Sequence, residues 1–392
     1  MKKILPLIII AFYATSIFAQ FHQGKIKQKH YFQVIPYQEI KGLLIVPVTI
    51  NGKTYQFAFD TGASLAISDK LYKELNLRTI CQIKAGDASG EKDKARIISL
   101  PEIDLQGITF RNTFGVVFHE NPEQSNFLDC LGVDGLIGSN MVRNSIVQFD
   151  VLNKQIIITN DIKKVSLGNS ECQKMELSLW QSSPYIQITL QKEAHITVEF
   201  DSGYGGGFFT SSLNKLNGCV VDTIAESEGT PSVFGFHGAY KKQKHVLLNI
   251  PKLDICGTTF NDVIVTATQN HHSLLGTKFL QYGKVTLDYK KKNFYFEVFD
   301  NINTNQPTEN QWAISTTIQN NKLIVGIIWD KTLESQINLE DEILSINGMD
   351  IQSMSFCELF LLKFPESDKC ILELRDINTG AIKTVEIERM HP

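Results

Sequence analysis

Two tripeptides, each made of an aspartate, a hydroxyl residue and a glycine, constrain this chain more than any other feature of its sequence. Apolar and polar residues alternate over residues 44–59 around Asn51-Gly52, which predicts a β-hairpin ending at Asp60-Thr61-Gly62. Asp201-Ser202-Gly203 follows a second strand-like segment at residues 186–200. Because glycine lets the backbone fold tightly directly after the aspartate, each aspartate is presented at the end of a strand.

The segments around the two tripeptides repeat in the same order. Leu136-Ile137-Gly138 is matched by Leu274-Leu275-Gly276, and Phe149-Asp150 is matched by Leu287-Asp288. Residues 100–110 are matched in the same way by residues 250–260. Several markers in one order and at nearly constant spacing indicate an internal duplication. An approximate two-fold axis between the two units would bring the two aspartates together.

The paired motifs resemble those of bacterial two-lobed aspartic proteases of the pepsin and retropepsin type, over roughly residues 30–300. The resemblance implies a mainly β fold with a two-lobed β-barrel body. It also implies an aspartic endopeptidase that needs no metal and no cofactor. Two close carboxyl groups share one proton, so that one takes a proton from water while the other hydrogen-bonds the scissile carbonyl. The implied catalytic residues are Asp60 and Asp201, supported by Thr61, Gly62, Ser64, Ser202 and Gly203.

Two features depart from the family pattern and leave a second function open. Ser64 stands where the family often has a hydroxyl that donates to the aspartate, but its counterpart in the second unit is Gly205. Only Asp60 then has such a donor, so we expect Asp60 to be the ionised partner. A flap over the cleft is expected at Gly86, Asp87, Ala88, Ser89 and Gly90, where the family's tyrosine is absent and an ordinary surface hairpin is the alternative. The intact pair of aspartates favours the protease, whereas these departures favour the alternative, a catalytically impaired protein that binds peptides.

The N-terminus has the pattern of a secretory signal. Lys2 and Lys3 precede an apolar segment that ends at the small residue Ala19, which predicts a signal peptide at residues 1–19. An uncleaved anchor helix is the alternative. We expect an exported protein, periplasmic or extracellular, that is a monomer and has no membrane span after signal removal. Its net charge of −4 argues against a nucleic-acid partner.

A chain of 392 residues is long enough for two or three domains. We expect an N-terminal lobe at 20–160, a C-terminal lobe at 161–300 and an Asn-rich linker at 301–310. The run Asp341–Gly348 resembles PDZ domains, which implies a PDZ-like α/β domain at 311–392. PDZ domains usually have glycine at the places of Gln336 and Glu340, and the predicted carboxylate-binding loop Gln311–Ile314 has none. The expected partner is a peptide or protein substrate, with capture of a peptide C-terminus by the PDZ-like domain left open.

Seven cysteines in an exported chain can form disulfides, with at least one left over. Cys219 with Cys256 and Cys357 with Cys370 are two possible pairs, and buried free thiols are the alternative. The cysteine spacing does not favour zinc, and His271-His272 is expected to be a solvated loop. The glycine-rich segment at residues 203–207 lacks the lysine of a phosphate-binding loop, and no Gly-x-Ser-x-Gly motif supports a serine hydrolase.

Overall fold

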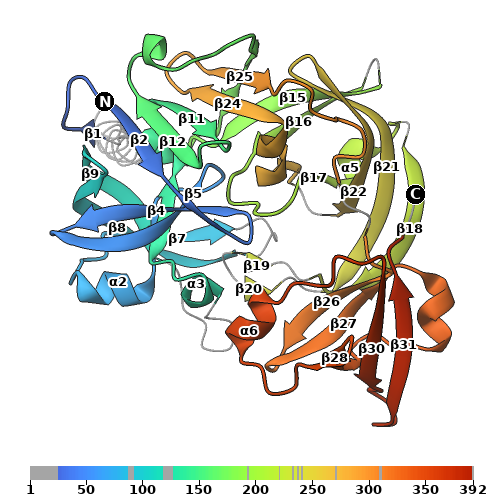
Figure 1. The fold of residues 1–392 in the computed structure, drawn as a ribbon. Helices are drawn as coiled ribbons and strands as arrows, with labels where there is room; N and C mark the ends of the chain where they lie inside the picture. The colour runs from blue at the N-terminus through green and yellow to red at the C-terminus, as the bar shows by residue number, and fades with distance from the viewer. Residues whose placement is uncertain are drawn as a thin grey trace, which may run out of the picture.

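The computed structural model describes residues 25–86, 92–117, 127–191, 194–219, 221–231, 234–235, 238–239, 242–269, 272–308 and 311–390. The expected signal peptide and four residues of the expected flap, Asp87 to Gly90, lie outside this part of the chain. The fold is mainly β, with only short helices (Figure 1). No helix within the described ranges is long and apolar enough to cross a membrane.

The first sheet has nine strands and contains the predicted hairpin. Positive φ angles at Asn51 and Gly52 form the tight turn between β4 and β5, as expected for an Asn-Gly hairpin. The order is β1-β9-β6-β10-β5-β4-β8-β7, with β3 paired to β4, and α2 (Asp69–Glu74), α3 (Phe127–Cys130) and α4 (Ser139–Val142) lie between the strands in sequence. The strands are β1 (Lys25–Ile26), β3 (Gln38–Ile40), β4 (Leu43–Ile50), β5 (Lys53–Asp60), β6 (Ala66–Ile67), β7 (Cys81–Gly86), β8 (Lys92–Leu105), β9 (Ile108–Val117) and β10 (Gly135–Gly138).

The second sheet has eight strands, in the order β14-β15-β16-β23-β17-β22-β21-β18. Its connections match those of the first sheet: β10 lies parallel to β5 and pairs Gly138 with Asp60, while β23 lies parallel to β16 and pairs Leu275 with Phe200. The strands are β14 (Glu176–Leu177), β15 (Pro184–Leu190), β16 (Ala194–Phe200), β17 (Phe209–Ser212), β18 (Asp222–Gly229), β21 (Gln243–Ile255), β22 (Thr258–Thr268) and β23 (Leu274–Leu275). The helix α5 (Leu213–Leu216) follows β17, and β19 (Phe234–Gly235) pairs with β20 (Gly238–Ala239).

A central six-stranded sheet joins the two halves, in the order β13-β25-β24-β11-β12-β2. Its middle strands come from different halves, and Gln148 of β11 pairs with Thr286 of β24, 138 residues later. On either side, Val147 pairs with Leu287 and Phe149 pairs with Val285. Val285 lies 138 residues after Val147, and Leu287 lies 138 residues after Phe149, so the same offset relates both pairs. This register places an approximate two-fold axis between β11 and β24. The strands are β2 (Phe32–Pro36), β11 (Ile146–Asp150), β12 (Gln155–Thr159), β13 (Glu171–Lys174), β24 (Gly283–Asp288) and β25 (Asn293–Val298), with η1 (Ile162–Lys164) and η3 (Thr277–Tyr282) as 3₁₀ turns.

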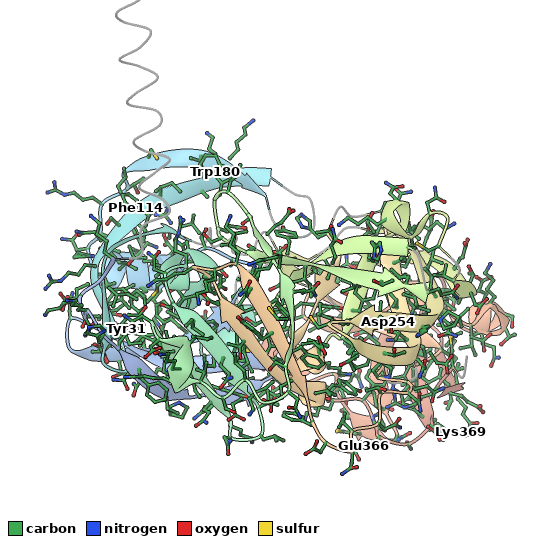
Figure 2. All side chains as sticks on the ribbon, turned by 90° about the horizontal axis from the view of Figure 1, so that it is seen from above. Tyr31, Phe114, Trp180, Asp254, Glu366 and Lys369 are labelled. Atoms are coloured by element: carbon green, nitrogen blue, oxygen red, sulfur yellow. A yellow bond between two sulfur atoms is a disulfide. The ribbon has the colours of Figure 1, made fainter. Side chains whose placement is uncertain are left out.

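Residues 311–390, which we call the C-terminal region, form a separate sheet with its own apolar core. The order is β26-β27-β28-β30-β31, with β29 paired to β28. Figure 2 shows this region, with Glu366 and Lys369, on the opposite side of the molecule from Tyr31. The elements are β26 (Ile314–Gln319), β27 (Lys322–Ile328), η4 (Lys331–Ser335), β28 (Glu342–Ile346), β29 (Met349–Asp350), α6 (Phe356–Leu361), β30 (Lys369–Arg375) and β31 (Ile382–Glu388).

The segment expected to be a linker packs along the second sheet. Thr308 Oγ1 accepts a hydrogen bond of 2.9 Å from the Ile264 amide, and Tyr282 donates one of 3.1 Å to the carbonyl of Pro307. Asn305 forms a bridge with Asn261. The described part of this segment, up to residue 308, is therefore held to the second half of the molecule.

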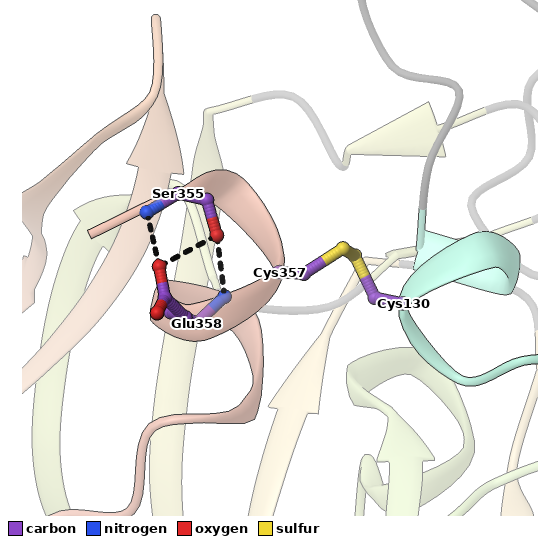
Figure 3. The surroundings of a disulfide bond; sticks show 4 residues. All are labelled: Cys130, Ser355, Cys357 and Glu358. Atoms are coloured by element: carbon purple, nitrogen blue, oxygen red, sulfur yellow. Dashed lines mark hydrogen bonds between the residues drawn. A yellow bond between two sulfur atoms is a disulfide. The ribbon is translucent and has the colours of Figure 1, made fainter.

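Both candidate disulfide pairs are wrong. Cys357, at the start of α6, is bonded to Cys130 of α3, 227 residues earlier in the chain (Figure 3). Cys370 is buried in the core of the C-terminal region as a free thiol, and Cys219 and Cys256 are also free. Because α6 packs against α3, the pairing follows from the docking of the C-terminal region, which local sequence spacing does not reveal.

Candidate active site

The two aspartates meet where the first and second sheets approach each other. Asp60 ends β5, and Asp201 directly follows β16. The glycines make this approach possible, because a Cβ on Gly62 would lie 2.5 Å from Asp201 Oδ1 and a Cβ on Gly203 would lie 2.4 Å from Asp60 Oδ2. Each glycine thus lies directly against the carboxyl group of the other half.

Thr61 and Ser202 form a reciprocal hydrogen-bond lattice below the aspartates. The Thr61 hydroxyl donates to the Phe200 carbonyl at 2.6 Å and accepts from the Ser202 amide at 2.9 Å. The Ser202 hydroxyl donates to the Phe59 carbonyl at 2.7 Å and accepts from the Thr61 amide at 3.0 Å. Both side chains are fully buried, so these bonds fix the two turns relative to each other.

Four aromatic rings from the three sheets pack together beneath this lattice. Phe59 and Phe200 directly precede the aspartates, and both contact Phe149 edge to face, at centroid distances of 5.7 and 5.6 Å. Phe294 continues the row against Phe200 at 5.6 Å. The rings exclude water from beneath the carboxyl groups and lower the local dielectric.

The pKa values of the two carboxyl groups are raised to different extents. The amide of Gly62 donates to Asp60 at 2.9 Å, and the amide of Gly203 donates to Asp201 at 2.8 Å. Burial raises the pKa of Asp60 to about 6, against the opposing effect of its bonds to Asp201 and to the amides of Gly62 and Ala63. Burial and the charge of Asp60 raise the pKa of Asp201 well above its ordinary range.

Ser64 does not have the contact that the sequence predicted. Among the described residues, no hydrogen bond joins Ser64 to Asp60, whose carboxylate accepts from the Gly62 amide, while the Ala63 amide donates to the Asp60 main-chain carbonyl. Each carboxylate accepts one backbone amide, from Gly62 and from Gly203, so these donors do not distinguish the two aspartates.

Gly205 is explained by packing between the two halves. The turn between β3 and β4 lies against it, so that a Cβ on Gly205 would lie 2.7 Å from the Lys41 carbonyl oxygen and 3.0 Å from the Leu43 side chain. A Cβ on Gly42 in the same turn would lie 2.1 Å from the Gly206 amide. A serine at position 205 has no room in this arrangement. Of the expected flap, Gly86 lies at the end of β7, where it pairs with Lys92 of β8.

The sequence did not reveal a buried carboxyl group beside Asp201. Glu199, two residues earlier and 5% exposed, accepts a hydrogen bond of 2.9 Å from Tyr185 and lies 3.8 Å from His272 Nδ1. Its charge contributes to the raised pKa of both aspartates, after burial and their mutual interaction. Strand alternation could have placed Glu199 on the same side as Asp201, but nothing in the sequence shows that this side faces the dyad.

Two further hydroxyls hold the turns from behind. Ser139, directly after Gly138, donates to the Thr61 carbonyl at 2.8 Å and shares a hydrogen bond with Tyr289. Thr277, directly after Gly276, accepts from the Gly206 amide at 3.0 Å. Each of these hydroxyl residues directly follows the repeated apolar-apolar-glycine motif, so that motif could have identified both from the sequence. No group of three or more metal-binding side chains occurs in the described ranges.

One protein-family model matches part of this chain. Residues 46–141 match the aspartyl protease family model, a segment that contains Asp60 and Gly138 but not Asp201. The chain is also similar to a crystal structure of a retropepsin-like aspartic protease from Rickettsia conorii. The identity is 19%, the match covers 34% of this chain and 95% of that chain, and the TM-score is 0.26, which is too low to assign a fold. No curated protein matches the chain.

Proposed function

We propose that this protein is an aspartic endopeptidase with Asp60 and Asp201 as its catalytic residues. One observation carries the proposal: two carboxyl groups from separate sheets meet above the reciprocal lattice of Thr61 and Ser202, each directly against the glycine of the other half. The aspartyl protease family match over residues 46–141 supports the same chemistry.

The difference between the carboxyl groups assigns their roles. Asp60, whose pKa is raised less than that of Asp201, is the ionised base that takes a proton from the attacking water. Asp201 keeps its proton and hydrogen-bonds the scissile carbonyl, where negative charge develops. After attack, the proton from water passes to the leaving amine and the dyad returns to its singly protonated form.

The remaining parts of the proposal concern architecture and location. The register of β11 with β24 supports a two-lobed body from an internal duplication, with lobes at 20–160 and 161–300. A PDZ-like domain at 311–392 is supported by Glu340, whose φ of +70° is the conformation for which PDZ domains use glycine at this place. The charge and apolar pattern of residues 1–19 supports export to the periplasm or the exterior of the cell.

The competing function is a protein that binds peptides without cleaving them. Its sequence support was the departure at Gly205 and the absence of the family's tyrosine from the expected flap. Packing against Lys41 and Leu43 accounts for Gly205, and most of the expected flap lies outside the described residues. Incubation of the mature chain with a mixed peptide library, read by mass spectrometry from acid to neutral pH, separates the two functions. Cleavage that is lost in both Asp60→Asn and Asp201→Asn supports the dyad. Cleavage that survives either substitution at a similar rate overturns it.

A further inference from the structure

The C-terminal region contacts both halves of the molecule. On the first half, the disulfide between Cys130 and Cys357 joins α3 to α6 (Figure 3). On the second half, the Thr230 amide, directly after β18, donates to the carbonyl of Gly326 in β27 at 2.9 Å. In Figure 1 this region lies at the bottom of the view, and strands β11 and β24 of the central sheet lie at the top. The region therefore bridges the two halves that carry the aspartates.

In the first half, this region packs on the face of β5 that carries Asp60. Side chains alternate between the two faces of a strand, so Ala58 and Asp60 share one face and Phe59 points to the other. The Phe59 ring contacts Phe149 of the central sheet. Ala58 instead belongs to a small apolar cluster against which Phe360 of α6 packs. The helix α6 therefore lies on the side of the first sheet from which a substrate would reach Asp60.

The second half shows the same arrangement. Phe200 points to the central sheet, where it contacts Phe149, so Glu199 and Asp201 belong to the opposite face. Leu274 is the partner of Glu199 in the neighbouring strand and shares that face. Leu274 lines a cavity whose other wall includes Trp312 of the C-terminal region. In both halves, the region thus lies on the face that carries the catalytic side chain.

One lysine connects α6 to the loop that begins at Asp201. Lys41 Nζ donates to the carbonyl of Leu362, directly after α6, at 3.1 Å. The main-chain carbonyl of Lys41 lies against Gly205, where a Cβ would be 2.7 Å from its oxygen. The Gly205 amide in turn donates to the Gly203 carbonyl at 2.9 Å. A displacement of α6 would therefore remove a contact that the two halves share.

The disulfide is the one covalent bond among the described residues that holds this arrangement. Cys130 and Cys357 are both partly exposed, so a thiol can reach the bond. Exposed disulfides are the ones that thiols reduce most readily. The Lys41 hydrogen bond and the packing of Phe360, the other contacts of α6 with the first half described above, are non-covalent. Reduction would therefore leave α6 held by contacts that open and close.

We propose that the C-terminal region is a cover on the substrate side of the dyad, held closed by the disulfide between Cys130 and Cys357 and released by a dithiol reductant. One thiolate of the reductant attacks one cysteine sulfur, and the bond between the two cysteines breaks. The second thiolate of the reductant then displaces the first. Each cysteine takes up one of the two protons that the reductant loses, and the reductant becomes the disulfide. The inference rests on the proposed function, since it concerns access to that dyad.

The test measures kcat/KM before and after reduction for two substrates that share one cleaved sequence. One is a short peptide from the library digest, and the other is an unfolded, cysteine-free protein. Reduction should raise kcat/KM for the protein about tenfold, as for a cover that is open in about a tenth of the oxidised molecules. The gain for the peptide should be clearly smaller, because a short chain needs less space to enter.

Two variants tie this gain to the disulfide. The double variant Cys130→Ser, Cys357→Ser should cleave the protein at the high rate without reductant and should not respond to it. Cys172→Ser, which changes an exposed free cysteine, is the matched control and should respond as the wild type does. Melting temperatures confirm that the variants are folded.

The outcomes separate the cover from the protease. Unchanged or slower cleavage of the protein after reduction, an equal gain for both substrates, or a double variant that still responds to reductant would overturn the cover and leave the protease standing. If neither substrate is cleaved in either redox state, the proposed function fails, and hydrogen exchange of the wild type tests the cover alone. Faster exchange at residues 41–45 and 355–362 after reduction would support release of α6, and unchanged exchange would reject it.

Discussion

The half-site of Asp60 and the half-site of Asp201 are alike where they touch and different in what surrounds them. The lattice of Thr61 and Ser202 is reciprocal, bond for bond. The surroundings differ because Leu136 pairs with Ala58 in the first half, whereas Leu274 pairs with Glu199 in the second. The comparison teaches that the symmetric part sets the geometry of the dyad, whereas the asymmetric part adds a charged side chain, Glu199, in the second half alone.

The largest expected effect comes from breaking the symmetric part. Thr61→Val removes a hydroxyl that makes two buried hydrogen bonds and leaves the Ser202 amide and the Phe200 carbonyl unpaired. Each unpaired group should cost about 1–3 kcal/mol of unfolding free energy. Ser202→Ala should give a similar loss in urea unfolding, because its two bonds are equivalent. Thr61→Ser keeps the hydroxyl as the control, and clearly unequal losses from the two substitutions would contradict the reciprocal lattice.

The next effect comes from making position 205 resemble position 64. Gly205→Ser should destabilise the protein by about 1–3 kcal/mol, because its Cβ meets the Lys41 carbonyl and Leu43. Gly205→Ala should be equally destabilising, since the added Cβ and not the hydroxyl causes the clash. Thermal unfolding measures both. A serine variant that is as stable as the wild type, or more active, would show that Gly205 is a defect in the site and not a packing requirement.

A smaller effect concerns the charge beside Asp201. Glu199→Gln removes a negative charge that contributes to the raised pKa of both aspartates, while its amide oxygen can still accept from Tyr185. His272 and Lys215, the other titratable groups near Glu199, are unchanged. Both limbs of the pH profile of kcat/KM should move to lower pH, and activity on the acidic limb should rise about three- to tenfold. The exposed Glu228 provides the control, Glu228→Gln. A profile that moves to higher pH would refute the role of Glu199.

The smallest effect is expected at Ser64. Its hydroxyl makes no hydrogen bond to Asp60 among the described residues, so Ser64→Ala should leave the acidic limb of kcat/KM in place and change stability by no more than about 0.5 kcal/mol. Movement of that limb to higher pH would restore the expectation, drawn from sequence alone, that Ser64 lowers the pKa of Asp60.

The sequence predicts the parts of this molecule that depend on local or repeated patterns. The β4–β5 hairpin follows from alternation around Asn51-Gly52, and the pairing of Thr61 with Ser202 follows from two repeated motifs. Contacts between distant surfaces are not predictable in this way. The bond between Cys130 and Cys357 depends on how α6 docks against α3, and the space at Gly205 depends on the turn at Lys41. Glu199 was missed because alternation gives the side of a strand but not what lies opposite it.

The central claim is that the dyad shares one proton unequally, with Asp60 as the base. The most direct measurement is kcat/KM across pH for the best-cleaved library peptide, because this quantity reports the free enzyme. Asp60 must be ionised, so activity should rise as the pH increases through about 6. It should fall again at higher pH, where Asp201 loses its proton. Activity that is already maximal in strong acid and declines through that region would contradict the account.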